Sequence, residues 1–164
     1  MDNKQFHTVR GYQLLEQNKK NLTSAMEDYL EMICRNSLKE GYLRINKLAE
    51  LLNVKASSAS KMVQKLGELG LLKYEKYGII ILSESGKEIG EFLLGRHNII
   101  EKFLETIGIN ENLLIETELI EHNISSNTLM NIKLLIDFFE NEPEIINMFR
   151  DFKEERSGEM FSNT

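Results

Sequence analysis

Apolar residues recur every three or four positions along most of this chain, a spacing that brings them onto one face of a helix. Within residues 24–37, Met26 and Leu30 belong to such a face. Ser24 stands before this run and Glu27 follows three residues later. We therefore predict a helix that Ser24 caps, with Glu27 closing a capping box.

Two further helices are predicted by the same spacing, over residues 44–52 and 57–69. The short segment Asn53-Val54 separates them and is predicted to form a turn. Two helices joined by so short a turn are typical of a helix-turn-helix.

A β-hairpin is predicted directly after this helix pair. Residues 71–75 and 79–83 are short apolar runs, and Lys76-Tyr77-Gly78 lies between them as a turn. A helix-turn-helix followed by a hairpin predicts a winged helix.

The remainder of the chain is helical in pattern and is divided by Gly108, Ser125-Ser126 and Pro143. Its first helix is predicted to begin at Ser85, again with a glutamate, Glu88, three residues later. The helices expected here cover residues 85–107, 111–123, 127–139 and 144–153.

These elements predict a mainly α protein with an N-terminal winged helix-turn-helix, a small β-hairpin wing and an all-helical second domain. The expected division is an N-terminal extension over residues 1–22, a winged helix-turn-helix over 23–84, a helical domain over 85–155 and a frayed tail over 156–164. The purpose of the extension does not follow from its pattern.

Composition is that of an ordinary globular protein, with 41% hydrophobic residues. No segment approaches the roughly 18 apolar residues of a membrane span, and the polar start lacks the apolar stretch of a signal peptide, so we expect a cytoplasmic protein. The one cysteine, Cys34, excludes an internal disulfide and is expected to be a small core residue. Any metal site would therefore use oxygen and nitrogen ligands.

Charge is divided along the chain. The net charge of −6 argues against a nucleic-acid partner, but residues 35–87 hold ten Lys and Arg against five Glu, a local net of +5. Residues 88–164 carry a net of −10. The basic segment coincides with the winged helix, which favours DNA binding over a merely solvated basic face; protein contact by the winged helix is a second alternative.

In a helix-turn-helix the second helix enters the major groove with its N-terminal residues at the bases. Here that end is rich in small hydroxyl and lysine side chains. The residues expected to contact DNA from the two helices and the wing are Arg44, Ser57, Ser58, Ser60, Lys61, Gln64, Lys65, Lys73, Lys76 and Tyr77.

Possible metal ligands gather at three places. Glu118, Glu121 and His122 stand at positions i, i+3 and i+4 of a predicted helix and so share one side of it. Further possible ligands are the pair Asp28 and Glu31 and the lone His97. Taken singly, each group is more often a solvated or packed polar side chain. Taken together, four carboxylates and two imidazoles favour octahedral Mn²⁺ or Fe²⁺ over tetrahedral zinc.

A metal-dependent enzyme is an alternative, because such clusters also hold catalytic metals. The His-x-x-Glu-His signature of one protease class is broken, since Glu118 stands where the first His belongs. A phosphate-binding glycine loop and a Gly-x-Ser-x-Gly motif are also missing from the sequence. We therefore expect no enzymatic activity.

Over roughly residues 22–153 the chain resembles the manganese transport regulators of the diphtheria toxin repressor, or iron-dependent repressor, superfamily. The segments that carry the resemblance are SAMEDYLE, SSASKMVQKL, YEKYGIIILSESGKEIG, RHNIIEKFL and ELIEHN. The resemblance implies a homodimer whose helical domain dimerises, and a pair of Mn²⁺ ions per subunit. The ligands it implies are Asp28, Glu31, His97, Glu118, Glu121 and His122.

Two positions favour manganese within this superfamily. Iron-sensing relatives have Met where this chain has Asp28 and Cys where it has Glu118, so Mn²⁺ is expected, with Fe²⁺ possible and other divalent ions binding in vitro. Asn123 receives no ligand role. His7 is expected to be solvated, with a stray ligand role as its alternative. The expected function is a metal-dependent repressor that binds a palindromic operator and controls metal-uptake genes. The alternatives are an Fe²⁺-activated repressor and a winged-helix regulator that senses an organic ligand.

Overall fold

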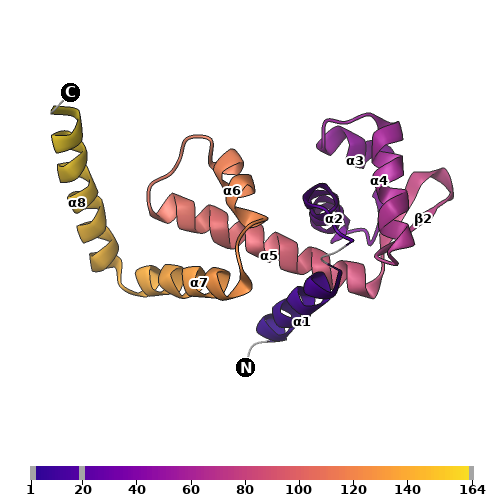
Figure 1. Cartoon of the computed structure of the whole chain (residues 1–164), viewed down its shortest axis with the longest axis horizontal. Helices are drawn as coiled ribbons and strands as arrows, with labels where there is room; N and C mark the ends of the chain where they lie inside the picture. Colours follow the sequence, from indigo (N-terminus) through magenta and orange to yellow (C-terminus); the bar gives the residue numbers. More distant parts are fainter. Residues whose placement is uncertain (1–2, 19–20, 163–164) are drawn as a thin grey trace. The chain divides into compact units, whose positions relative to one another are not determined.

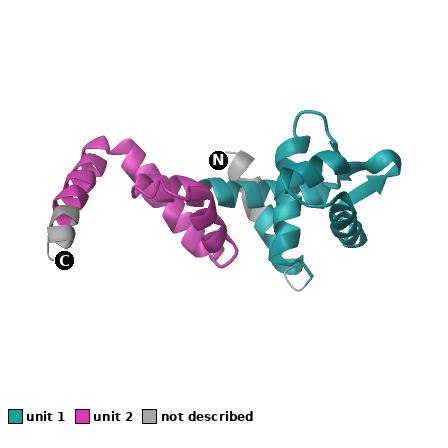
Figure 2. Ribbon diagram, turned by 90° about the horizontal axis from the view of Figure 1, so that it is seen from above, with its two compact units in different colours: residues 1–98 teal, residues 99–164 magenta. Residues whose placement is uncertain are grey.

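Helices make up most of this protein, and a small antiparallel sheet is confined to its N-terminal half (Figure 1). The computed structural model describes residues 3–18 and 21–162, with side chains described for residues 11–18 and 21–156. Two compact units, Met1–Asn98 and Ile99–Thr164, divide the chain within helix α5 (Figure 2). Within the described ranges, no helix is both long enough and apolar enough to cross a membrane. The mainly α fold class with an N-terminal winged helix is confirmed.

Helix α2 (Ser24–Ser37) forms where the sequence predicted it and supplies the centre of the first core. Its side chains Leu30 and Cys34 are fully buried, which confirms Cys34 as a core residue. The predicted cap was wrong by one residue. The N-cap is Thr23, whose hydroxyl accepts a hydrogen bond from the backbone N–H of Met26 at 3.4 Å. Thr23 takes this role because its backbone is extended, as capping requires.

The helix-turn-helix is formed by α3 (Ile45–Leu51) and α4 (Ala56–Glu68), which pack against each other and against α2. Val63 and Leu66 of α4 are fully buried, as an amphipathic helix requires. The two helices confirm the predicted motif, with each end within one residue of the prediction.

The wing consists of β2 (Leu72–Glu75), a single 3₁₀ turn (Lys76–Gly78) and β3 (Ile79–Leu82). Tyr77 and Gly78 both have positive φ, at 64° and 73°, so the chain reverses direction within this turn. The predicted hairpin is confirmed.

A third strand, β1 (Leu43–Arg44), was not predicted. It pairs antiparallel with β3, with Leu43 opposite Ile80, and the strand order is β1-β3-β2. Two residues carry too little periodicity to reveal a strand. Strand β1 forms because it pairs with β3, which lies more than thirty residues further along the chain.

Helix α5 (Glu84–Thr106) begins one residue before the prediction. Ser83, rather than Ser85, provides the capping hydroxyl, which accepts a hydrogen bond from the Gly86 N–H at 3.1 Å. Further along, a Cβ on Gly90 would lie only 2.7 Å from the Cβ of Cys34. The missing side chain at Gly90 therefore lets α5 approach α2 closely.

Residues 3–18 form a helix, α1 (Asn3–Asn18), in the extension whose purpose the pattern left open. Leu15 is buried, and the rings of Tyr12 and Phe92 lie 5.6 Å apart between centroids. A Cβ on Gly11 would overlap the backbone oxygen of Glu88. Helix α1 thus packs directly on α5.

A Gly11→Leu variant should weaken this packing, because the new side chain would meet the Glu88 backbone and Phe92. We expect faster proteolytic removal of the N-terminal segment and a loss of about 1–3 kcal/mol of stability. Limited proteolysis and urea unfolding measure both effects. Gln13→Leu is the matched control, since Gln13 is exposed on the same helix; equal protease resistance in the two variants would contradict this packing.

The second unit contains the end of α5, then α6 (Leu113–Glu121), α7 (Ser126–Asn141) and α8 (Pro143–Ser162). The Ser125 hydroxyl caps α7, and the Lys153 ammonium donates to the Ile107 carbonyl at 2.8 Å. Helix α8 continues well past the predicted end at Lys153, into the segment expected to be frayed.

Candidate metal centre and nucleic-acid interface

Three possible ligands lie in the first unit, on α2 and α5, and we call Asp28, Glu31 and His97 the first ligand group. Glu31 and His97 are 9% and 5% exposed, and Oε1 of Glu31 lies 3.9 Å from Nδ1 of His97. Asp28 lies one helical turn before Glu31 and is exposed. Glu31 and His97, which lie on separate helices, are thus brought together by the fold.

Two arginines bind carboxylates at or beside this group. Arg35 donates from Nη2 to Oε1 of Glu31 at 2.8 Å, and Arg96 donates from Nη2 to Oε2 of Glu27 at 2.8 Å. The second pair is largely buried, with 6% of the Arg96 side chain and 15% of the Glu27 side chain exposed. Glu27 thus forms an ion pair that joins α2 to α5, which the sequence did not predict.

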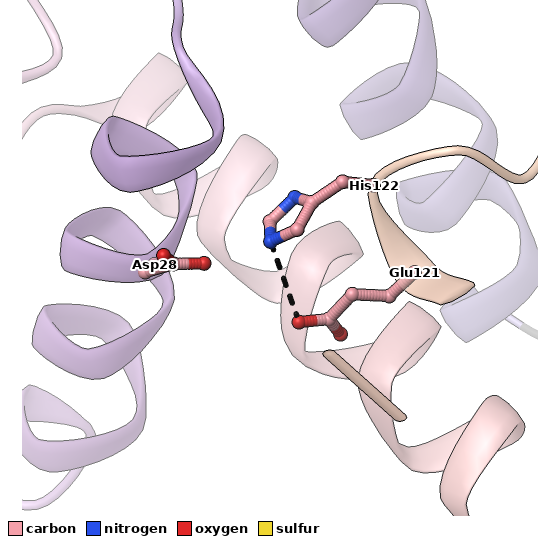
Figure 3. Close-up of side chains that lie close together, drawn as sticks. All are labelled: Asp28, Glu121 and His122. Atoms are coloured by element: carbon pink, nitrogen blue, oxygen red, sulfur yellow. Dashed lines mark ion pairs between the residues drawn. The ribbon is translucent and has the colours of Figure 1, made fainter. Parts of the chain in front are cut away.

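The other three possible ligands, Glu118, Glu121 and His122, form the second ligand group at the end of α6. Glu121 is the last residue of the helix and His122 is its C-cap. Nε2 of His122 lies 3.8 Å from Oε1 of Glu121, and Figure 3 shows this contact as a dashed line, with Asp28 drawn on its own helix. Glu121 is only 2% exposed. The carbonyl end of a helix carries partial negative charge, which favours a cation there.

Glu118 has the weakest structural support of the six. It lies one turn before Glu121 on α6 and is exposed. Among the described residues, no set of three ligand atoms within 4.8 Å of one another includes Glu118.

The two close pairs suit a divalent ion by both chemistry and distance. A metal with bonds of about 2.1 Å joins two ligand atoms up to about 4.2 Å apart. The 3.9 Å of Glu31 and His97 and the 3.8 Å of Glu121 and His122 both fall within this limit. Carboxylate oxygen and imidazole nitrogen suit manganese and iron, so the donor set fits these ions.

Cys34 is not a ligand in this arrangement. Burial, and next the nearby Glu91 carboxylate, raise the pKa of its thiol to about 11. Among the described residues, the groups of possible ligand atoms within 4.8 Å of one another contain carboxylates and imidazoles and do not include Cys34, so the donors are oxygen and nitrogen.

The predicted DNA-contacting side chains of α4 are mostly exposed. Ser57, Ser58, Lys61, Gln64 and Lys65 all lie on the solvent side of the helix. The N-cap residue of α4 makes no side-chain cap hydrogen bond. The first turn can therefore offer backbone N–H groups to a phosphate.

Ser60 is the exception, because it is half-buried and its hydroxyl lies 3.1 Å from the hydroxyl of Tyr74 on β2. This hydrogen bond joins α4 to the wing. The wing residues Lys73, Lys76 and Tyr77 are exposed, with Tyr77 at 89%, and so is Arg44 of β1.

Sequence reasoning missed Arg35 and Arg96 as partners of carboxylates near the ligands. The spacing of Arg35, four residues after Glu31, was a readable signal for an ion pair on one helix. No comparable signal joins Arg96 to Glu27, which lies 69 residues earlier. The side chain of His7 lies outside the described residues.

Two family descriptions match this chain and together cover most of it. "Iron dependent repressor, N-terminal DNA binding domain" matches residues 21–80, and "Iron dependent repressor, metal binding and dimerisation domain" matches residues 83–150.

Curated relatives include HTH-type transcriptional regulators MntR. The protein from Oceanobacillus iheyensis is 45% identical over 121 residues, which are 73% of this chain and 82% of the relative. The protein from Bacillus subtilis is 42% identical over 121 residues, 73% of this chain and 85% of the relative.

Solved structures give the same picture. A "Manganese-dependent transcriptional repressor complex with manganese" matches with a TM-score of 0.61 and 28% identity, over 69% of this chain and 53% of that chain. The metal-dependent transcriptional regulator MtsR matches with a TM-score of 0.62 and 28% identity, over 69% and 54%. This chain thus spans about half the length of the proteins in these two structures.

Proposed function

Because the chain belongs to the iron dependent repressor family, and within it to the manganese transport regulators, we propose that the two ligand groups form its manganese sensor. The protein is a metal-dependent, DNA-binding transcriptional repressor, and manganese is favoured over iron as its activating metal. The observation that carries the sensor proposal is the pair of close carboxylate–imidazole contacts, Glu31 with His97 and Glu121 with His122.

Divalent metal binding is the property on which regulation depends, and we propose two Mn²⁺ ions per subunit. The proposed ligands are Asp28, Glu31, His97, Glu118, Glu121 and His122. When bound, the metal supplies positive charge that offsets the mutual repulsion of four carboxylates. Selection of the metal by raw affinity would disfavour manganese, which lies at the weak end of the Irving–Williams order. We therefore propose that coordination geometry discriminates manganese from the other divalent ions.

DNA is bound by the winged helix, and we propose that its exposed residues contact different parts of the DNA. Side chains on the first turns of α4 reach base edges, while the wing and Arg44 contact the phosphate backbone. For Ser60 we propose first a positioning role, because its hydroxyl is hydrogen-bonded to Tyr74.

The protein acts as a homodimer, and its second unit offers large apolar side chains for that contact. Leu134, Leu135 and Phe138 on α7 are exposed by 61%, 41% and 45%, and Met148 on α8 by 69%. Exposed apolar side chains gathered on neighbouring helices are typical of a subunit interface.

We propose a palindromic operator, since two symmetric DNA readers match two half-sites about one DNA turn apart. We further propose that the regulated genes serve metal uptake, that the protein works in the cytoplasm, and that it has no catalytic role. We also propose the division into an extension (1–22), a winged helix (23–84), a metal-binding and dimerisation domain (85–155) and a tail (156–164).

Metal control is proposed to work by preferential binding to the DNA-competent conformation. Coupling of this kind typically amounts to about 1–3 kcal/mol, which changes DNA affinity by roughly 5- to 150-fold.

A gel shift on a palindromic operator tests this function, with Mn²⁺, Fe²⁺, Zn²⁺ or a chelator added to the full chain. We expect binding to strengthen by roughly 5- to 150-fold with Mn²⁺ and to return to its basal level with chelator. Equal binding under all conditions would indicate a regulator that senses something else, such as an organic ligand. Activation by Fe²⁺ and not by Mn²⁺ would overturn the manganese assignment.

A further inference from the structure

Arg35 lies one helical turn after Glu31 on α2, with its guanidinium at the edge of the first ligand group. The Arg35 side chain is 40% exposed and the Glu31 side chain 12% exposed. Nη2 of Arg35 donates a hydrogen bond to Oε1 of Glu31 at 2.8 Å. A solvent-exposed cation is therefore bonded to an inward-facing carboxylate.

The oxygen that Arg35 binds is the one that faces the imidazole. Oε1 of Glu31 lies 3.9 Å from Nδ1 of His97. A metal ion held by both of these atoms would share that oxygen with the guanidinium. Two positive charges would then compete for a single oxygen.

We propose that Arg35 competes with the metal for Glu31 and thereby raises the manganese concentration at which this repressor responds. This inference rests on the proposed function, because it takes Glu31 and His97 as metal ligands. Arg35 does not bind the metal itself; it is a positioning residue that acts through Glu31.

The sign of the effect follows from two opposed contributions. Arg35 orients the Glu31 side chain, but an ion pair four residues apart on a helix, with one partner well exposed, orients it only weakly. Repulsion between the guanidinium and a divalent ion a few ångströms away weakens metal binding by about tenfold even with a water-like dielectric constant. Repulsion is the larger contribution, so removing the charge should tighten binding.

The test is a titration of metal-free, full-length protein with MnCl₂, in which electron paramagnetic resonance measures the free hydrated ion. Arg35→Gln removes the charge and keeps hydrogen-bonding capacity, and we expect it to bind Mn²⁺ about tenfold more tightly than the wild type. Arg35→Lys keeps the charge and should stay within about twofold of the wild type. A gel shift in parallel should show Arg35→Gln binding operator DNA at correspondingly lower Mn²⁺.

Lys47→Gln is the matched control, since it removes the same charge from another exposed ion pair, with Glu50 at 3.0 Å on α3. Its Mn²⁺ affinity should not change. Damage to the fold would weaken metal binding, so a gain in affinity separates the proposed role from a structural one.

Unchanged or weaker Mn²⁺ binding by Arg35→Gln, alongside normal binding by the wild type, overturns this inference and leaves the proposed function standing. A wild type that does not bind Mn²⁺ at all overturns both.

Discussion

A Glu121→Gln variant should lose Mn²⁺-dependent operator binding while keeping its fold. Glu121 is only 2% exposed, and its Oε1 lies 3.8 Å from Nε2 of His122. The glutamine amide has nearly the same size as the carboxylate but carries no charge. The main effect of the substitution is therefore a weaker attraction for a cation. Mutation of a residue that only orients a metal ligand typically lowers metal affinity by 10- to 100-fold. For Glu121, which we propose as a direct ligand, we expect Mn²⁺ affinity to fall by about 100-fold.

Two measurements separate metal binding from folding in this variant. Titration with MnCl₂ gives the dissociation constant, and urea unfolding of the metal-free protein gives the free energy of unfolding. Glu116→Gln is the matched control, because Glu116 lies on the same helix and is exposed. Its metal affinity should equal that of the wild type.

Glu118→Gln adds a graded comparison within the second ligand group. Glu118 is exposed, so its replacement should weaken Mn²⁺ binding less than replacement of Glu121. Wild-type Mn²⁺ affinity in Glu121→Gln would remove Glu121 from the ligand set and with it the main support for the sensor.

An Arg96→Met variant should unfold at markedly lower urea concentration than the wild type. Arg96 and Glu27 form a largely buried ion pair at 2.8 Å. Methionine fills much of the space of the arginine stem but leaves the Glu27 carboxylate without that buried cation. Removal of one partner of a buried ion pair typically costs about 3–5 kcal/mol.

Metal binding should weaken in the same variant. Glu27 immediately precedes Asp28, and Arg96 immediately precedes His97. The ion pair therefore joins α2 and α5 beside the residues that we propose as ligands. Titration of the folded variant with MnCl₂ measures this second effect.

Lys87→Met provides the control for the stability measurement. Lys87 is on the same helix, but its side chain is 61% exposed and its Nζ lies 3.9 Å from Glu91. Its loss should cost less than about 1 kcal/mol. In the double variant Glu27→Gln with Arg96→Met, part of the stability should return, because no buried carboxylate is left uncompensated. An Arg96→Met protein as stable as Lys87→Met would show that the buried pair contributes little.

Local pattern was sufficient for most of the secondary structure and for the donor chemistry. Helix α2, helix α4 and the hairpin of β2 and β3 all form where spacing predicted them, because apolar periodicity records which side of each element is buried. The chemical types of the possible ligands were also readable from sequence, since a carboxylate or imidazole offers the same donors wherever it lies. The caps were less certain, because Thr23 and Ser24, or Ser83 and Ser85, offer similar hydroxyls within two residues of each other.

Only the tertiary structure decided which distant groups meet. Strand β1 exists because it pairs with β3, and helix α1 packs on α5 where Gly11 has no side chain to obstruct Glu88. Glu27 pairs with Arg96, and Glu31 lies 3.9 Å from His97, because α2 and α5 are packed together. Such contacts join residues far apart in the chain, and their energies depend on burial and distance. A one-dimensional pattern contains neither quantity.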